Sequence, residues 1–204
     1  MGAFEMFTRG NDGSEEPSTP VPPPVRPSVG EQLGTLARLG LETQDGVSAQ
    51  DVADDRDAAG WVKLHPYVAV LQVMARGEDG SLTRHPRVTT VDLDHLVGPE
   101  SYPELVRKLA DAAGTTHLLS EVEGGVDEER GRWLVRFTFD DVTREIHPRR
   151  DHDRADPVVM PELFSAVAGA GQRPAYVRHG RSMTVAYVPA RHAGELQRVF
   201  SRWA

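Results

Sequence analysis

The sequence contains no cysteine, and this absence removes several kinds of chemistry at once. A chain of 204 residues without cysteine has no disulfide framework, no thiolate zinc site and no cysteine nucleophile. Long hydrophobic runs are also missing: the longest aliphatic run, at residues 68–71, is far shorter than the roughly 18 residues of a membrane-spanning helix. The first ten residues lack a basic segment followed by an apolar one, so no secretory signal is expected. We therefore expect a cytoplasmic protein that does not enter a membrane.

Catalytic and phosphate-binding motifs are absent as well. The sequence holds no G-x-S-x-G, no G-x-x-x-x-G-K-[ST], no H-E-x-x-H and no G-x-G-x-x-G pattern. Lys and Arg total 23 against 31 Asp and Glu, a net charge of −8. Nucleic acid is an unfavourable partner for such a chain, because its binding depends on neutralising phosphates. The composition favours a protein that needs no cofactor and is not an enzyme, although it leaves catalysis open.

Proline is concentrated near the N-terminus. Six of the 15 prolines lie at residues 17–27, where fixed φ angles and missing amide donors favour an extended polyproline-II conformation. We predict a disordered tail at residues 1–27, most simply a linker. Residues 28–204 are expected to form a single α+β domain. A helical and hairpin subdomain at 28–100 joined to a sheet domain at 101–204 is the alternative.

The negative charge is confined to the first half of the chain. Residues 28–100 hold 12 acidic and 6 basic residues, whereas residues 101–204 hold 15 of each. An acidic surface attracts a basic partner over a distance and raises its association rate. A partner attracted by charge is therefore expected to meet residues 28–100 first.

Helix boundaries are marked by capping signals. Residues 28–31 (SVGE) and 101–104 (SYPE) match the capping box, in which a hydroxyl and a carboxylate each satisfy a free backbone N–H. Apolar residues follow at helical spacing, and Gly40 and Gly114 stand where each helix is expected to end. A shorter helix is predicted from Ser48.

Two strand-like runs precede residue 100. Residues 67–75 are apolar on both parities, which predicts a strand covered on both faces. A weaker run at residues 82–93 contains Pro86, which cannot donate a ladder hydrogen bond. That run is therefore expected to form an edge strand or two short pieces.

The clearest strand pattern lies in the second half of the chain. Side chains at residues 132–139 alternate between apolar and polar, as in a strand with one buried face. Two aspartates at 140–141 are predicted to turn the chain, and residues 142–147 return. Pairing across this turn places Arg136 opposite Glu145, a favourable cross-strand pair.

The last third of the chain predicts a helix, a hairpin and a second helix. The first helix is expected to begin near Met160, and the last ends near Trp203. The hairpin strands, 175–178 and 181–188, are predicted to meet around a turn at His179-Gly180. Short turns imply antiparallel pairing, so we predict an α+β fold. Its antiparallel sheet is expected to have about five to seven strands, with helices packed mainly on one face.

Three segments combine acidic residues with helix starts: residues 92–95 (DLDH), 101–104 (SYPE) and 156–157 (DP). This pattern of acidic residues beside helix starts is similar to that of the immunity proteins that bacteria make against secreted toxins. The element order predicted from 101 to 203 also resembles that of type III secretion chaperones and related small bacterial α/β binding folds. Both resemblances imply a protein-binding role without catalysis.

The predicted hairpin turn is the first candidate site. If the turn is His179-Gly180, Arg178 and Arg181 face each other, and their guanidinium groups could hold a phosphate, a carboxylate or an acidic patch. The simpler alternative is that both side chains point into water or pair with nearby acids. Together with acids of the region that a basic partner would meet first, the candidate partner-binding residues are Asp92, Asp94, Glu100, Arg178, His179 and Arg181.

A second candidate is the polar loop that follows residue 146. His147, Asp151, His152 and Asp156 are residue types that bind divalent metals. Three arginines in the same loop would repel a cation, so a solvated loop of mixed charge is the simpler interpretation. We predict no metal site, and keep this loop as the centre of an alternative function.

The leading hypothesis is a non-catalytic protein-binding module, either an immunity-type inhibitor or a chaperone-like adaptor. Its acidic face would bind a basic protein such as a toxin or another secreted protein, and the protein itself would be a monomer or a homodimer. A metal-dependent hydrolase that uses the loop at 147–156 is one alternative. A domain that senses an anionic ligand through Arg178 and Arg181 is another.

Overall fold

We describe a computed structural model of the chain, over residues 25–55, 60–62, 64–150 and 155–203. Residues 1–24 of the predicted tail lie outside this part of the chain. The predicted α+β class with antiparallel strands is confirmed. After residue 100 the main elements follow in the predicted order of helix, three strands, helix, two strands and helix.

The described N-terminal region holds short helices and short strands: α1 (Val29–Arg38), α2 (Ala49–Asp54), α4 (Val68–Leu71), β1 (Ala75–Arg76), β2 (Leu82–Thr83), β3 (Val88–Asp92) and the 3₁₀ turn η1 (Leu93–His95). Ser28 caps α1 and closes the predicted capping box with Glu31, and Ser48 caps α2 in the same way with Asp51. The run at residues 82–93 forms two short strands, β2 and β3, on either side of Pro86, which confirms the prediction of two short pieces.

The strand predicted at residues 67–75 is wrong. Residues 68–71 form the helix α4, and all four of its side chains are buried. Periodicity cannot separate a short buried strand from a short buried helix when both parities are apolar. Only the end of the run, at Ala75 and Arg76, is a strand.

The C-terminal region holds the longer elements: α5 (Ser101–Ala113), the 3₁₀ turn η2 (Thr116–Leu118), β4 (Leu119–Asp127), β5 (Arg132–Phe139), β6 (Val142–Ile146), α6 (Met160–Ala166), β7 (Gln172–His179), β8 (Ser182–Pro189) and α7 (Ala190–Trp203). The predicted register of β5 and β6 is confirmed, and Arg136 lies opposite Glu145. The capping box predicted at Ser101 is wrong, because Ser101 is the first helical residue and its hydroxyl donates to the carbonyl of Gly98.

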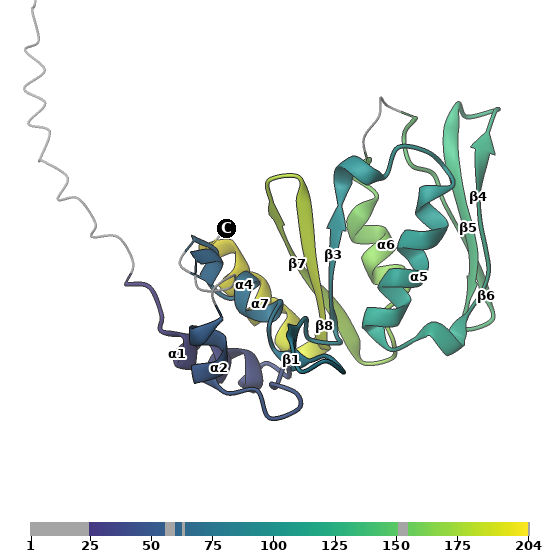
Figure 1. Ribbon diagram of the computed structural model, residues 1–204. Helices are drawn as coiled ribbons and strands as arrows, with labels where there is room; N and C mark the ends of the chain where they lie inside the picture. The colour runs from purple at the N-terminus through teal and green to yellow at the C-terminus, as the bar shows by residue number, and fades with distance from the viewer. Residues whose placement is uncertain (1–24, 56–59, 63, 151–154, 204) are drawn as a thin grey trace, which may run out of the picture.

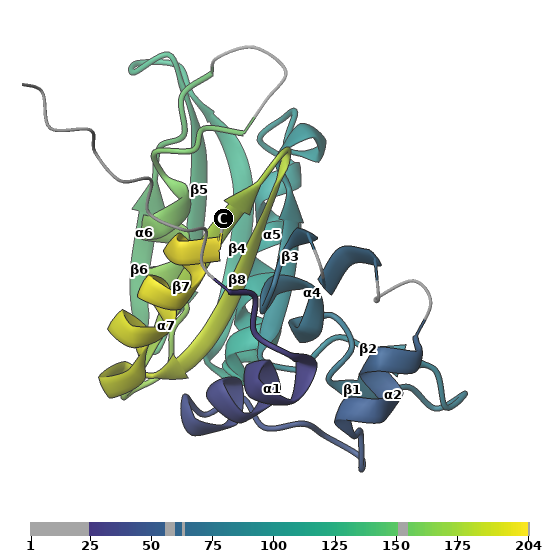
Figure 2. The same ribbon diagram turned by 90° about the vertical axis from the view of Figure 1, so that its left-hand side faces the viewer.

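The strands of the described chain form three antiparallel sheets rather than one (Figure 1). A central sheet has the order β3-β8-β7, an outer sheet has the order β4-β5-β6, and β1 pairs with β2. Helices α5 and α6 lie between the central and outer sheets, and α1, α4 and α7 cover the opposite face of the central sheet (Figures 1 and 2). The helices thus cover both faces of the central sheet rather than mainly one, because β8 is apolar on both.

Two hydrophobic cores meet at β8. Its side chains are buried from Met183 to Val188. Val185 and Tyr187 point into the first core, between the two larger sheets, whereas Ala186 and Val188 point into the second core, under α1, α4 and α7. Since β3 pairs with β8 along its whole length, the region before residue 100 supplies one edge of the central sheet.

His85 is a buried polar side chain whose neutral form supports the fold. It is 2% exposed, and its Nδ1 accepts a hydrogen bond of 3.0 Å from the backbone N–H of Arg87. Burial lowers the pKa of His85 from 6.5 to about 4. Since the unfolded chain then binds the proton more readily, this stabilisation is complete above pH 6.5 and is lost as the pH falls from 6.5 towards 4.

We expect His85→Asn to flatten the pH dependence of the free energy of unfolding between pH 6.5 and pH 4. The Asn side-chain oxygen can accept the same N–H, and it does not titrate. Urea denaturation at a series of pH values measures the effect, with the exposed His117→Asn as control. An unchanged slope in His85→Asn would contradict this role.

Candidate partner-binding site

The turn between β7 and β8 differs from the prediction by one residue. It is formed by Gly180 and Arg181, and Gly180 has a φ of 61° that suits glycine at the first position of a tight hairpin turn. Arg178 therefore lies opposite Met183, and His179 lies opposite Ser182. The predicted pair of facing arginines is not formed.

Arg181 instead pairs with an acidic residue of η1. Its Nη1 lies 2.7 Å from Oδ2 of Asp94, and its backbone carbonyl accepts a hydrogen bond of 2.9 Å from the N–H of Leu93. Asp92 lies opposite Ser182 on the adjoining strand. The structure thus brings Asp92, Asp94 and Arg181 together as neighbours, although they were predicted from separate arguments. Because the Arg181 side chain is 81% exposed, this ion pair contributes at most about 1 kcal/mol.

Two of the other predicted residues lie outside this contact. Glu100 is exposed at the N-cap of α5. Arg178 is exposed on β7, and its Nε donates a hydrogen bond of 3.2 Å to the carbonyl of Gly180. Neither Glu100 nor Arg178 therefore takes part in the ion pair between Asp94 and Arg181.

His179 lies in an aromatic cluster that the sequence analysis missed. Its ring centroid is 6.4 Å from that of Trp61 and 6.1 Å from that of His65, and the Trp61 and His65 centroids are 5.7 Å apart. Trp61 is 52% exposed and Leu64 is 66% exposed. The i, i+4 spacing of Trp61 and His65 could have indicated this cluster from the sequence, since residues four apart lie on the same side of a helix. We use the name tip surface for Trp61, Leu64, His65 and His179 together with Arg181 and Asp94, which pair at the β7–β8 turn that follows His179.

A chain of polar side chains holds His179 from below. Its Nε2 lies 2.8 Å from the hydroxyl of Thr184, which is fully buried on β8. The Thr184 hydroxyl lies 3.3 Å from that of Thr90, and Thr90 accepts a hydrogen bond of 3.3 Å from the amide of Gln72. Burial lowers the pKa of His179, and the charge of His65 lowers it further. His179 is thus an oriented, neutral ring at the base of the tip surface.

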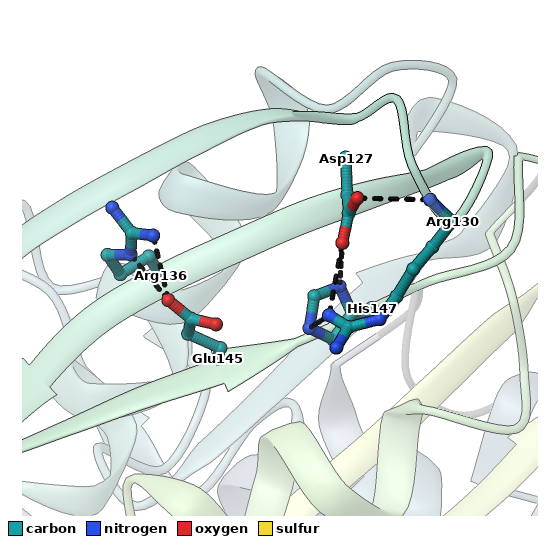
Figure 3. Close-up of polar contacts among 5 residues, drawn as sticks. All are labelled: Asp127, Arg130, Arg136, Glu145 and His147. Atoms are coloured by element: carbon teal, nitrogen blue, oxygen red, sulfur yellow. Dashed lines mark hydrogen bonds and ion pairs between the residues drawn. The ribbon is translucent and has the colours of Figure 1, made fainter.

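A second polar cluster joins the ends of β4 and β6 (Figure 3). Oδ2 of Asp127 lies 3.0 Å from Nη1 of Arg130 and 3.5 Å from Nδ1 of His147, and the same Nη1 lies 3.0 Å from Nε2 of His147. The backbone N–H of Arg130 is the largest cause of the lowered pKa of Asp127. Nearby, Arg136 and Glu145 form a cross-strand ion pair at 2.8 Å. These contacts fasten the outer sheet and engage His147 with protein partners.

Asp156 is the second described residue of the polar loop that was considered as an alternative metal site. Asp156 is 7% exposed, and its two carboxylate oxygens accept hydrogen bonds from the backbone N–H groups of Arg149 and Val158 at 3.0 and 2.9 Å. Asp151 and His152 lie outside the described residues. In the described part of the chain, no group of three or more His, Asp or Glu side chains is arranged to hold a metal ion.

The chain matches no protein-family model, no curated protein and no solved structure. Its function is therefore argued from its own residues. None of the helices described here is long and apolar enough to cross a bilayer. The feature that stands out is the tip surface, where the exposed Trp61 lies against an oriented histidine at the end of the β7–β8 hairpin.

We expect His179 to titrate below the ordinary histidine pKa of 6.5, and His65→Gln to raise its pKa only part of the way back. Removing His65 removes the repulsion between two imidazolium rings, whereas burial, the larger cause, remains. A titration of the imidazole proton signals by NMR measures both values, with His95→Gln as a control that leaves His179 unchanged. A His179 pKa that does not respond to His65→Gln would contradict the coupling.

Proposed function

We propose that this protein is a non-catalytic module that binds another protein, as an immunity-type inhibitor or a chaperone-like adaptor in the cytoplasm. The observation that carries the proposal is the exposure of Trp61 and Leu64 on the tip surface, at 52% and 66%. Tryptophan and arginine are enriched among the residues that dominate binding energy at protein interfaces. Trp61 contacts His179, and Arg181 lies two residues after His179 in the β7–β8 turn, so this end of the hairpin offers both types.

The tip surface is preorganised for binding. His179 is held by Thr184 on a buried strand, and its ring supports Trp61 at 6.4 Å. A side chain that is already oriented loses less conformational entropy when a partner covers it. Rigid aromatic groups with an ion pair at the rim are typical of a protein-binding surface.

Charge supports a basic partner, such as a basic toxin or another secreted protein. Residues 28–100 hold twice as many acidic as basic residues, and this region contributes Trp61, Leu64, His65 and Asp94 to the tip surface. The field of these acids would raise the association rate of a basic protein. We propose that the module works as a monomer or a homodimer.

The alternative functions have less support from the described geometry. Arg181 is paired with Asp94, and Arg178 is not beside it across the turn, so a two-arginine anion clamp is not preformed. Nε2 of His147 lies 3.0 Å from Nη1 of Arg130, and the Asp156 carboxylate accepts two backbone hydrogen bonds. Protein binding through the tip surface requires neither clamp nor metal.

We expect Trp61→Ala to weaken partner binding by about 30-fold, the effect of losing roughly 2 kcal/mol at a central aromatic residue. Partners are captured from a lysate of the native host at low and moderate salt, and binding of the recovered protein is then measured by calorimetry. Leu64→Ser should weaken binding as well. Val158→Ser is the matched control, because Val158 is equally exposed at 66% and lies outside the tip surface.

Two results would overturn the proposal. One is that no stoichiometric protein partner is recovered at either salt concentration. The other is that a recovered partner binds the Trp61→Ala and Val158→Ser variants with equal affinity.

A further inference from the structure

The two edges of the central sheet differ in whether their outward backbone groups have hydrogen-bond partners. On β7, the side-chain amide of Gln197 accepts a hydrogen bond of 3.0 Å from the N–H of Tyr176 and donates one of 2.9 Å to its carbonyl. This amide occupies the position of a neighbouring strand, so α7 closes that edge. The opposite edge is β3, whose only strand partner among the described residues is β8.

The backbone of β3 has free hydrogen-bonding groups along this edge. Tyr187 donates to the carbonyl of Arg87, and Leu93 donates to that of Arg181, so the odd-numbered residues from 87 to 93 face β8. Thr90 and Asp92 therefore direct their N–H and C=O groups away from the sheet. The carbonyl of Thr90 accepts a hydrogen bond of 2.8 Å from Nζ of Lys108, while the N–H groups of Thr90 and Asp92 have no partner among the described residues.

Two hollows lie along the same edge, and Lys108 lines both. One, of about 350 Å³, is lined by Val91, Leu96 and Leu105, by the acids Asp92 and Glu104, and by Ser101 and His95, whose Nδ1 lies 3.6 Å from Oδ2 of Asp92. The other, of about 290 Å³, lies next to Val88 and Thr89 and is lined by Arg84 and Asp111 as well, so it has no acidic excess. In the larger hollow two carboxylates face one lysine, so its lining keeps an acidic excess beside three apolar side chains. This combination fits a side chain that has an aliphatic stem and a positive end.

We propose that the β3 edge accepts an extended, basic segment of the protein partner as an added strand. The inference rests on the proposed protein-binding function and names the part of the partner that is bound. Backbone groups of the segment pair with Thr90 and Asp92, and Lys108 gives up the Thr90 carbonyl to a peptide N–H. A Lys or Arg of the segment enters the larger hollow and pairs with Asp92 and Glu104. Since η1 follows β3 directly, the added strand runs towards the tip surface.

The test uses the full chain and three synthetic peptides of ten residues. The first alternates Lys and Val, the second alternates Glu and Val, and the third is the Lys-Val peptide with every amide N-methylated. We expect only the unmodified Lys-Val peptide to slow hydrogen exchange at the N–H groups of Thr90 and Asp92, by tenfold or more at saturation. The methylated peptide keeps its charge but cannot donate backbone hydrogen bonds, so it separates strand addition from charge attraction.

Variants of the chain test the same edge from the other side. Thr90→Pro removes the outward N–H at a position where an edge strand tolerates proline, and it should weaken binding of the Lys-Val peptide at least tenfold. Thr90→Val is the matched comparison because it loses the same hydroxyl but keeps the N–H, and Thr90→Pro should bind the peptide at least tenfold more weakly than Thr90→Val. Glu104→Gln should weaken binding several-fold, whereas Asp141→Asn, an exposed acid on the far turn of the outer sheet, should not. If Thr90→Pro does not fold, the methylated peptide and Glu104→Gln decide the question.

Several results would overturn the inference. Equal binding of the methylated and unmodified peptides would show that the edge is not used. Protection of Thr90 without peptide that rises with protein concentration would show that a second copy occupies it. Protection without peptide at every concentration would point to a segment of the same chain. A captured partner that is lost in Trp61→Ala but retained in Thr90→Pro would leave the proposed function intact and remove strand addition alone.

Discussion

The structure depends on one strand, β8, that is buried on both faces and bonded on both sides. It separates the two hydrophobic cores, and it is the only strand of the described central sheet with two strand neighbours. A strand of this kind requires apolar cover above and below, which is why helices lie on both faces of the sheet. It also requires every buried polar group to be satisfied, because an unpaired hydroxyl in a core costs about 1–3 kcal/mol. Two residues of this buried run carry hydroxyls: Tyr187, whose OH donates a hydrogen bond of 3.1 Å to the carbonyl of Phe164, and Thr184.

The hydrogen bonds of the buried Thr184 hydroxyl connect the core to the surface. Its hydroxyl lies within hydrogen-bonding distance of Thr90 on β3 and of His179 on β7, so one buried group fixes side chains on both neighbouring strands. His179 in turn contacts Trp61 and His65, which come from a distant part of the chain. The exposed aromatic cluster is therefore supported by the core. A surface side chain without such support would have many orientations and would lose more entropy on binding.

Local features could be predicted from the sequence, and features that depend on long-range packing could not. The β5–β6 register was predictable because a two-residue turn and a clear alternation determine it locally. Likewise, the capping box at Ser28 involves residues only three positions apart. The position of α4 was not predictable, since burial on every side removes the periodic signal. The turn at Gly180 was predicted one residue early, because both strands have apolar residues that allow either pairing. For the candidate site, the sequence indicated Asp92, Asp94, His179 and Arg181 but not Trp61, whose contact with His179 arises only from the tertiary fold.

For the proposed basic partner, long-range attraction and binding energy would come from different groups of this protein. The acidic excess of residues 28–100 acts over long distances, but individual acids such as Asp51 and Asp94 are already paired with Arg76 and Arg181. Exposed pairs of this kind are screened by salt and contribute little to affinity. In the proposed function, affinity would come from groups that lose water or gain hydrogen bonds on contact: the rings of the tip surface and the N–H groups of β3 that have no partner among the described residues. Because β3 and η1 belong to the acidic region, the segment that we propose to attract a basic partner is also the one that carries the free edge. Higher salt should then slow association much more than it speeds dissociation, since dissociation is governed by contacts that salt does not screen.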